Sequence, residues 1–140
     1  MKFSRSPFAV LTLVGFCLSL FPPFAQATSN YEYRPDEFVV ITNGRSPDGK
    51  YSIAAHGEGD LGYDNFHLYL MGAPSGKKFG ALTEIKDALD TGADAFTAKW
   101  SADSKMVSIT YRVDRRESAM VSYRIENGRA TRTSGPVKVK

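Results

Sequence analysis

Apolar and polar residues alternate along most of the chain, and a period of two is typical of β-strands that bury one face. The clearest run covers 106–113, where Val107, Ile109, Tyr111 and Val113 alternate with polar residues. Other runs rich in β-branched and aromatic residues fall at 38–42, 51–56, 66–71, 78–82, 96–100 and 121–125. The pattern therefore predicts an all-β fold of antiparallel strands that follow one another through hairpins.

Two similar polar turns lead into the strands at 51–56 and 106–113. They read Ser46-Pro47-Asp48-Gly49-Lys50 and Ser101-Ala102-Asp103-Ser104-Lys105. In such turns an aspartate bonds backbone amides ahead of it, and Gly49 accepts a positive φ. The matched positions of Asp48 and Asp103 therefore favour a structural role over a catalytic carboxylate pair.

The segments around these strands carry further local signals. Asn43-Gly44 is expected to end the first strand, and Asn127-Gly128 is typical of a two-residue hairpin. The strand at 51–56 is expected to bury Tyr51, Ile53 and Ala55 and to expose its other face. Residues 83–95 interrupt the alternation, since Leu82, Ile85 and Leu89 stand at helical spacing. We expect a short helical turn or an ordered loop there.

The repeated turns divide the chain into two similar units, at about 38–82 and 96–137. The stretch from Lys99 to Ile109, and more fully 46–50, resembles the W-S-P-D-G-K signature of TolB-type β-propeller repeats. That resemblance implies blades of antiparallel strands, each with a later glycine turn such as 75–77 or 127–129. Because a propeller ring normally takes four or more blades, two units imply two blade-like sheets, as a partial propeller or a small sandwich.

Residues 1–27 have the features of a secretory signal peptide. Lys2 and Arg5 precede an almost wholly apolar stretch from 8 to 21, and Ala25-Gln26-Ala27 is typical of a cleavage site. We therefore expect an exported protein, periplasmic or extracellular, with a single all-β domain at 28–140 and no stable membrane anchor after cleavage. The single cysteine, Cys17, falls in the leader, so the expected domain has no disulfide.

Charge argues against one class of partner. The chain has 18 basic and 15 acidic residues, and two of the basic residues fall in the leader. The remainder is nearly neutral, whereas nucleic-acid binding needs a strongly basic face. Arg115 and Arg116 could join other arginines near the C-terminal hairpins as a weak binding candidate. Acidic residues interleave with them, which favours a mixed solvated surface.

The best candidate site is the stretch from His56 to His67. It carries His56, Asp60, Tyr63, Asp64 and His67, and imidazoles with carboxylates are ligands that metals use. The spacing matches no established ligand frame, so we favour a solvated hairpin loop and predict no metal and no cofactor. The serines fall in turns and neither histidine has a recognisable partner, so no catalytic residue is assigned. Trp100, Tyr111 and Tyr123 are expected in the core.

Three functions fit these observations. The favoured one is an exported binding or interaction module whose partner is another envelope protein or a small ligand, because its loops carry no catalytic set. The alternative is a small periplasmic hydrolase or metal-dependent enzyme that uses the His56–His67 loop. The third is a structural assembly subunit, a homo-oligomer in which exposed sheet edges pair between chains.

Overall fold

The structure is a computed structural model that describes residues 30–140, so the expected leader lies outside the described residues. Eight strands and one three-residue 3₁₀ helix follow one another along residues 30–140. Their bounds are β1 Val39–Arg45, β2 Tyr51–Glu58, β3 Asp64–Gly72, β4 Lys78–Ala81, η1 Ala93–Ala95, β5 Phe96–Trp100, β6 Met106–Arg112, β7 Ser118–Glu126 and β8 Arg129–Val139. Within the described part of the chain, no helix is long or apolar enough to span a bilayer.

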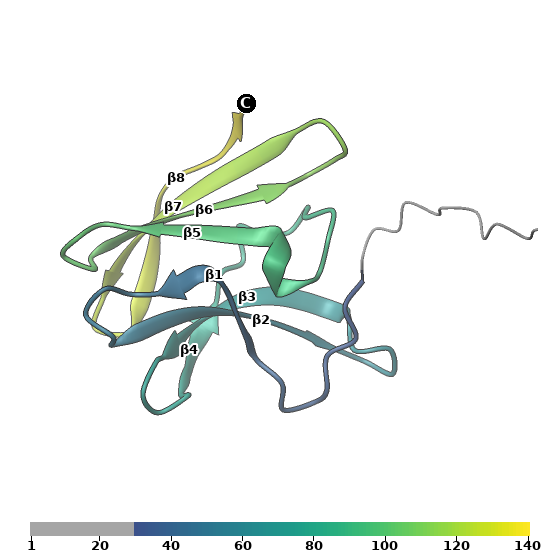
Figure 1. The fold of residues 1–140 in the computed structure, drawn as a ribbon, viewed down its shortest axis with the longest axis horizontal. Helices are drawn as coiled ribbons and strands as arrows, with labels where there is room; N and C mark the ends of the chain where they lie inside the picture. Colours follow the sequence, from purple (N-terminus) through teal and green to yellow (C-terminus); the bar gives the residue numbers. More distant parts are fainter. Residues whose placement is uncertain (1–29) are drawn as a thin grey trace, which may run out of the picture.

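All eight strands belong to one curled sheet with the order β4-β3-β2-β1-β5-β6-β7-β8 (Figure 1). Strands β1–β4, the first unit, are antiparallel neighbours, and so are β5–β8, the second unit. The units meet where β1 runs parallel to β5, with Thr42 opposite Thr97. The predicted all-β fold of two antiparallel, blade-like sheets is confirmed.

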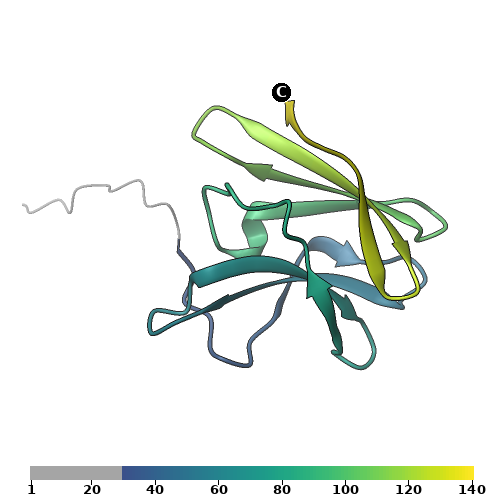
Figure 2. The same ribbon diagram turned by 180° about the vertical axis from the view of Figure 1, so that it is seen from behind.

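The curl turns one face of each unit toward the other, as the front and back views show (Figures 1 and 2). These inner faces share one continuous core. At one end the β7–β8 hairpin reaches back to the first unit, where the Gly128 amide donates to Tyr51 Oη over 2.9 Å. The largest fully buried side chains of the core are Ile53, Leu68, Leu70, Ile85, Phe96, Val107, Ile109, Val121 and Tyr123.

The strand period explains this core. In β6 and β7 every second side chain is buried, as the alternation predicted for Val107, Ile109 and Tyr111. Tyr123 is fully buried among these side chains, and Trp100 packs against them at the end of β5. The aromatic side chains expected in the core therefore lie there.

The two polar turns have the same hydrogen-bonded structure. Asp48 Oδ1 accepts from Ser46 Oγ at 2.7 Å and from the Lys50 amide at 3.0 Å. Asp103 Oδ1 accepts from Ser101 Oγ at 2.6 Å and from the Lys105 amide at 3.0 Å. Each aspartate thus satisfies turn donors, which is the structural role expected of both.

The turns also touch each other, because β1 and β5 are parallel neighbours and end on the same side. The Asp48 amide donates to Ser104 Oγ over 3.0 Å. Ser104 is buried and takes φ +61°, the position at which the first turn has Gly49 with φ +73°. The second turn therefore uses a strained serine to make a contact that glycine cannot make.

Acid is expected to weaken the fold through these turns. Hydrogen bonds from the Lys50 amide and Ser46 lower the pKa of Asp48 below its usual 3.8, and those from Ser101 and the Lys105 amide lower the pKa of Asp103. A carboxylate whose pKa is lower in the folded state than in the unfolded state stabilises the fold at pH values above its unfolded-state pKa. This stabilisation is lost as pH falls through the folded-state pKa. Urea unfolding between about pH 7 and pH 2.5 measures this effect. Below about pH 4 the free energy of unfolding should fall less for the double variant Asp48→Asn, Asp103→Asn than for the parent.

Asp60→Asn, in the exposed β2–β3 loop, is the matched control for this comparison. Its acid profile shows what the loss of one exposed carboxylate outside the two turns does on its own. Identical acid profiles for the double variant and the parent would contradict the structural role of the two turn carboxylates.

Three local expectations were wrong. Asn43-Gly44 does not end the first strand: Asn43 takes φ +56°, the pairing register shifts between Val40 and Arg45, and β1 continues to Arg45 as a bulged strand. Strand β2 does not expose one face, because the side chains from Ser52 to His56 are all buried. The hairpin loop expected between His56 and His67 is shorter, because β2 continues to Glu58 and β3 begins at Asp64.

Residues 83–92 form an ordered loop, which is one of the two structures expected for this segment. The only helix in the described chain is the turn at Ala93–Ala95. Leu82 and Ile85 are buried, which explains their apolar spacing without a helix. Polar contacts hold the loop on the second unit: Tyr123 Oη donates to Glu84 Oε2 at 3.0 Å, and Arg112 pairs with the buried Asp90 at 2.9 Å.

Candidate functional site

The two histidines lie in strands and face each other across the β2–β3 pair. His56 Nδ1 lies 2.6 Å from the Glu37 carbonyl oxygen, which can only accept, so Nδ1 carries the proton. The His56 ring is buried and stacks on Phe38 with centroids 4.1 Å apart. His67 Nε2 contacts Asn65 Oδ1 at 3.2 Å. The His56 ring therefore packs as an aromatic side chain, and the His67 ring lies edge to face with Tyr69, with centroids 6.1 Å apart.

The other residues predicted for this site do not converge on the histidines. Asp60 is exposed and Tyr63 half-buried in the β2–β3 loop, and Asp64 is exposed at the start of β3, opposite Glu58. Asn65 Nδ2 donates to Glu58 Oε2 at 3.2 Å, so this carboxylate serves the hairpin. Among residues 30–140, no group of three or more His, Cys, Asp or Glu side chains is placed to hold a metal ion.

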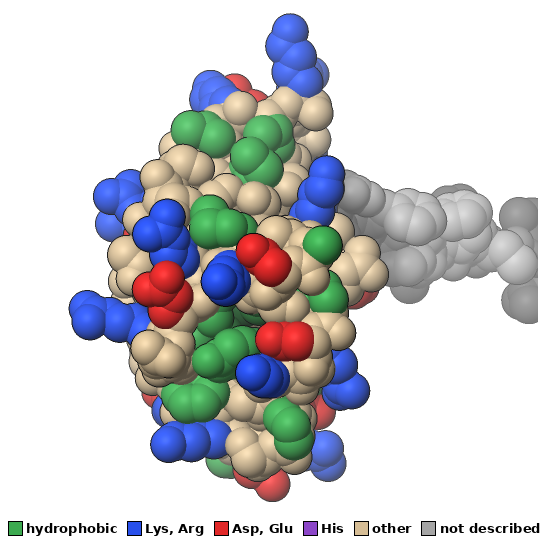
Figure 3. Space-filling model, turned by 90° about the vertical axis from the view of Figure 1, so that its left-hand side faces the viewer, with side chains coloured by type: hydrophobic (Ala, Val, Ile, Leu, Met, Phe, Trp, Pro, Cys, Tyr) green, Lys and Arg blue, Asp and Glu red, His purple; other side chains and the backbone are tan. Residues whose placement is uncertain are grey.

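Arg115 and Arg116 lie apart from the histidines, in the β6–β7 turn of the second unit, and both are exposed. The turn is built by Asp114 Oδ1, which accepts from the Arg116 amide at 2.7 Å and the Glu117 amide at 2.8 Å. The opposite end of β6, where the two polar turns lie, shows basic and acidic side chains intermixed (Figure 3). The structure therefore shows no single-sign patch on that face.

The structure does reveal an apolar outer face on the first unit, the side turned away from the shared core. Ala54, Tyr69 and Met71 are buried there in a second cluster, against which Phe38 packs. Phe38 and Tyr69 meet edge to face, with ring centroids 5.5 Å apart. The Lys78 ammonium lies over the same two rings, 5.9 Å and 5.2 Å from their centroids. This outer face continues from the histidine pair.

A shallow groove of about 260 Å³ crosses this outer face. Its lining includes Asp36, Phe38, Val40, Arg45, Ala54 and Met71. Val40 is 41% exposed and lies opposite Ala54 of the buried cluster. The groove therefore presents apolar surface between one acidic and one basic side chain.

The outer face of the second unit is different. It carries mainly hydroxyl and charged side chains, at Thr97, Lys99, Ser108, Thr110 and Ser122. Ser108 Oγ and Ser122 Oγ bond each other at 2.7 Å, so that face satisfies its own polar groups. A sheet face that meets only water is expected to look like this one. The apolar outer face of the first unit is thus the exception.

The sequence contains a feature that indicates this apolar outer face, although the period-two pattern alone did not predict it. Residues 66–71 are apolar or aromatic at both parities, and a strand with such a run is covered on both faces. Phe38 could not be assigned to a face from sequence, because its partner strand was unknown.

Comparison with known proteins yields no relative: no family model, no curated protein and no solved structure matches the chain.

Proposed function

We propose that the protein is an exported interaction module that self-associates through the apolar outer face of its first unit. Export rests on the leader at 1–27. The observation that carries the self-association is the contrast between the two units, since only the first builds a second apolar cluster on the side away from the core. Within the chain Phe38 packs against this cluster, and the half-buried Phe38 and the 41% exposed Val40 leave apolar surface beside it that a partner can cover.

A second copy of the same chain is the occupant that fits the groove best. A two-fold interface places the same residues on both sides, so its charges must be self-compatible. The groove has one acidic and one basic side chain, Asp36 and Arg45. In a two-fold contact Asp36 of one copy can face Arg45 of the other, and Phe38 and Val40 lose exposed apolar surface on contact.

The arrangement of the two blade-like units is compatible with such a contact. Parallel β1 and β5 join the two units edge to edge in one sheet. In a propeller, sheets pack face to face around the axis, and the described chain offers one more apolar sheet face for such packing. Docking of two first units would give an assembly of four stacked sheets.

Replacing Val40 with aspartate is expected to abolish self-association. The parent protein should behave as a dimer in light scattering on a sizing column across a concentration series. Val40→Asp would bury a carboxylate at the contact, and uncompensated burial of a charge costs several kcal/mol, about a thousandfold in the dimer dissociation constant. The variant should elute as a monomer.

Leu61→Asp provides the control, because Leu61 is 53% exposed in the β2–β3 loop and not part of the groove. It should remain dimeric, and far-UV circular dichroism should confirm that both variants are folded. A parent that stays monomeric at about 100 µM, the concentration at which even weak contacts between proteins are populated, would refute the proposal. So would a Val40→Asp variant that remains dimeric.

A further inference from the structure

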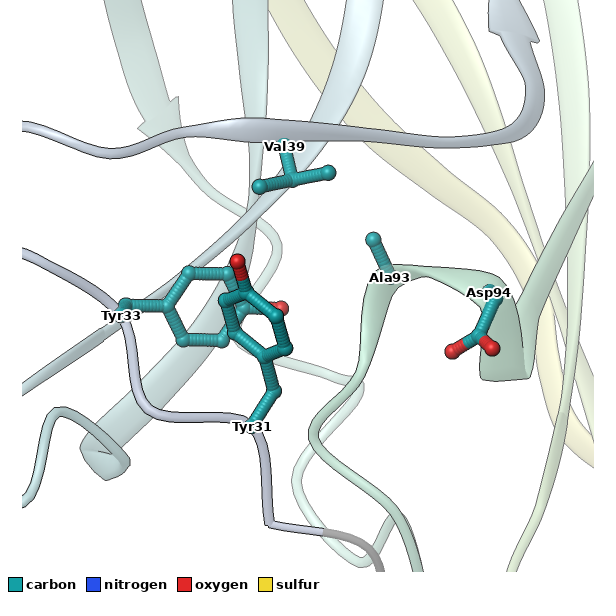
Figure 4. Close-up of a pocket in the computed structure, with 5 residues that line it drawn as sticks. All are labelled: Tyr31, Tyr33, Val39, Ala93 and Asp94. Atoms are coloured by element: carbon teal, nitrogen blue, oxygen red, sulfur yellow. The ribbon is translucent and has the colours of Figure 1, made fainter.

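A separate pocket lies where the segment before β1 crosses η1, and its walls are aromatic. It has a volume of about 220 Å³ and is lined by Tyr31, Tyr33, Val39, Ala93 and Asp94. The two tyrosines stand on one side, Asp94 on the other, and Val39 above (Figure 4). Sites for drug-sized ligands occupy roughly 300–1,000 Å³, so this pocket suits a smaller one.

The aromatic wall is held rigidly in place. Tyr33 is 5% exposed, and its Oη donates to the Thr91 carbonyl oxygen at 2.6 Å. The Tyr31 ring lies edge to face with that of Tyr33, with centroids 4.5 Å apart. The Tyr31 amide donates to Thr91 Oγ1 at 2.8 Å, and Tyr31 Oη donates to Glu37 Oε2 at 3.2 Å. A wall pinned at four points loses little conformational entropy when a ligand arrives.

The charges around the pocket favour a cation. Glu37 and Asp94 are acidic, and the nearby base, Arg34, pairs with Glu37 at 3.5 Å and points largely into solvent. Burial is the main cause that raises the pKa of Tyr33, and the negative charges of Glu37 and Asp94 add to it. Both tyrosines therefore stay neutral, with electron-rich ring faces, beside a carboxylate that lines the pocket.

We propose that this tyrosine pocket binds a small organic cation of the quaternary ammonium class, with Tyr31 and Tyr33 facing its methyl groups and Asp94 balancing its charge. A trimethylammonium group is apolar on its surface and positively charged, and it donates no classical hydrogen bond. Aromatic faces, the apolar side chains of Val39 and Ala93 and one carboxylate match those properties. A compact metal ion would instead require several oxygen ligands in place of rings.

Titration of the purified protein with choline, followed by NMR, tests the proposal. Saturable shifts are expected with choline and not with its uncharged isostere 3,3-dimethyl-1-butanol at equal concentration. Tyr31→Leu and Asp94→Asn should each weaken choline binding by about two- to thirtyfold, the range expected for one cation–π contact or one partly exposed charge. Co-sedimentation with phosphatidylcholine vesicles then shows whether the cation is a free solute or a lipid headgroup.

Tyr31 is 43% exposed and Asp94 lies on the surface, so both variants should fold, and unchanged thermal midpoints will confirm it. Leu61→Ala, outside the pocket, should bind choline as the parent does. The absence of saturable choline binding would overturn the proposal. So would equal binding of the uncharged isostere, or variants that bind choline as tightly as the parent.

Discussion

Phe96→Ala is expected to lower the free energy of unfolding by about 3–5 kcal/mol, the range for removing a fully buried phenylalanine. Phe96 is 0% exposed and lies on β5, where the two units meet. Its ring centroid is 5.6 Å from that of Phe66 in the first unit and 5.9 Å from that of Tyr111 in the second. The substitution therefore opens a cavity between the units and removes aromatic contacts to both.

Guanidinium unfolding followed by the fluorescence of Trp100, the single tryptophan, measures this loss. Domains of this size are stable by only about 5–15 kcal/mol, so the midpoint should move well beyond experimental error. Leu61→Ala removes an exposed apolar side chain and should change the free energy by less than about 0.5 kcal/mol. Equal stabilities for the two variants would mean that Phe96 does not join the units.

Gly62→Ala should destabilise the protein by about 2–5 kcal/mol. Gly62 has φ +73°, which costs an L-residue about 1–2 kcal/mol. A Cβ at this position would also overlap the backbone of Tyr33, whose amide donates to the Gly62 carbonyl oxygen at 3.0 Å. Overpacking adds about 1–3 kcal/mol, because backbone cannot rotate away as a side chain can.

Gly49→Ala separates the two causes, because Gly49 has the same φ of +73° but nothing within 4 Å of its added Cβ. It should cost only the conformational term, about 1–2 kcal/mol in denaturant unfolding. Hydrogen exchange of the Tyr33 amide should accelerate in Gly62→Ala alone, as the segment before β1 detaches. Equal losses in both variants would show that the segment moves aside without cost.

The sequence by itself determined several local features of this protein. Period-two alternation located β5, β6 and β7 closely, since one buried face per strand leaves a clear pattern. The turn at Asn127 and Gly128 was predictable because both residues take a positive φ, +50° and +73°, as a two-residue hairpin requires. The structural use of Asp48 and Asp103 followed from chemistry within each turn. All these features depend on residues close together in the chain.

Contacts between distant segments were decided only by the tertiary structure. The parallel pairing of β1 with β5 joins the two units, and a single sequence contains no local signal for which strands become neighbours. That pairing also brings Asp48 beside Ser104. The contact between the two polar turns therefore depends on tertiary packing.

The candidate sites follow the same division. The sequence named His56 and His67 by residue type, but the burial of His56 against Phe38 depends on how the segment before β1 folds over β2. The tyrosine pocket joins residues 31–39 to 93–94, which lie far apart along the chain. Chain order and residue type determine strands and turns, whereas a surface assembled across such separations is set by packing of the whole sheet.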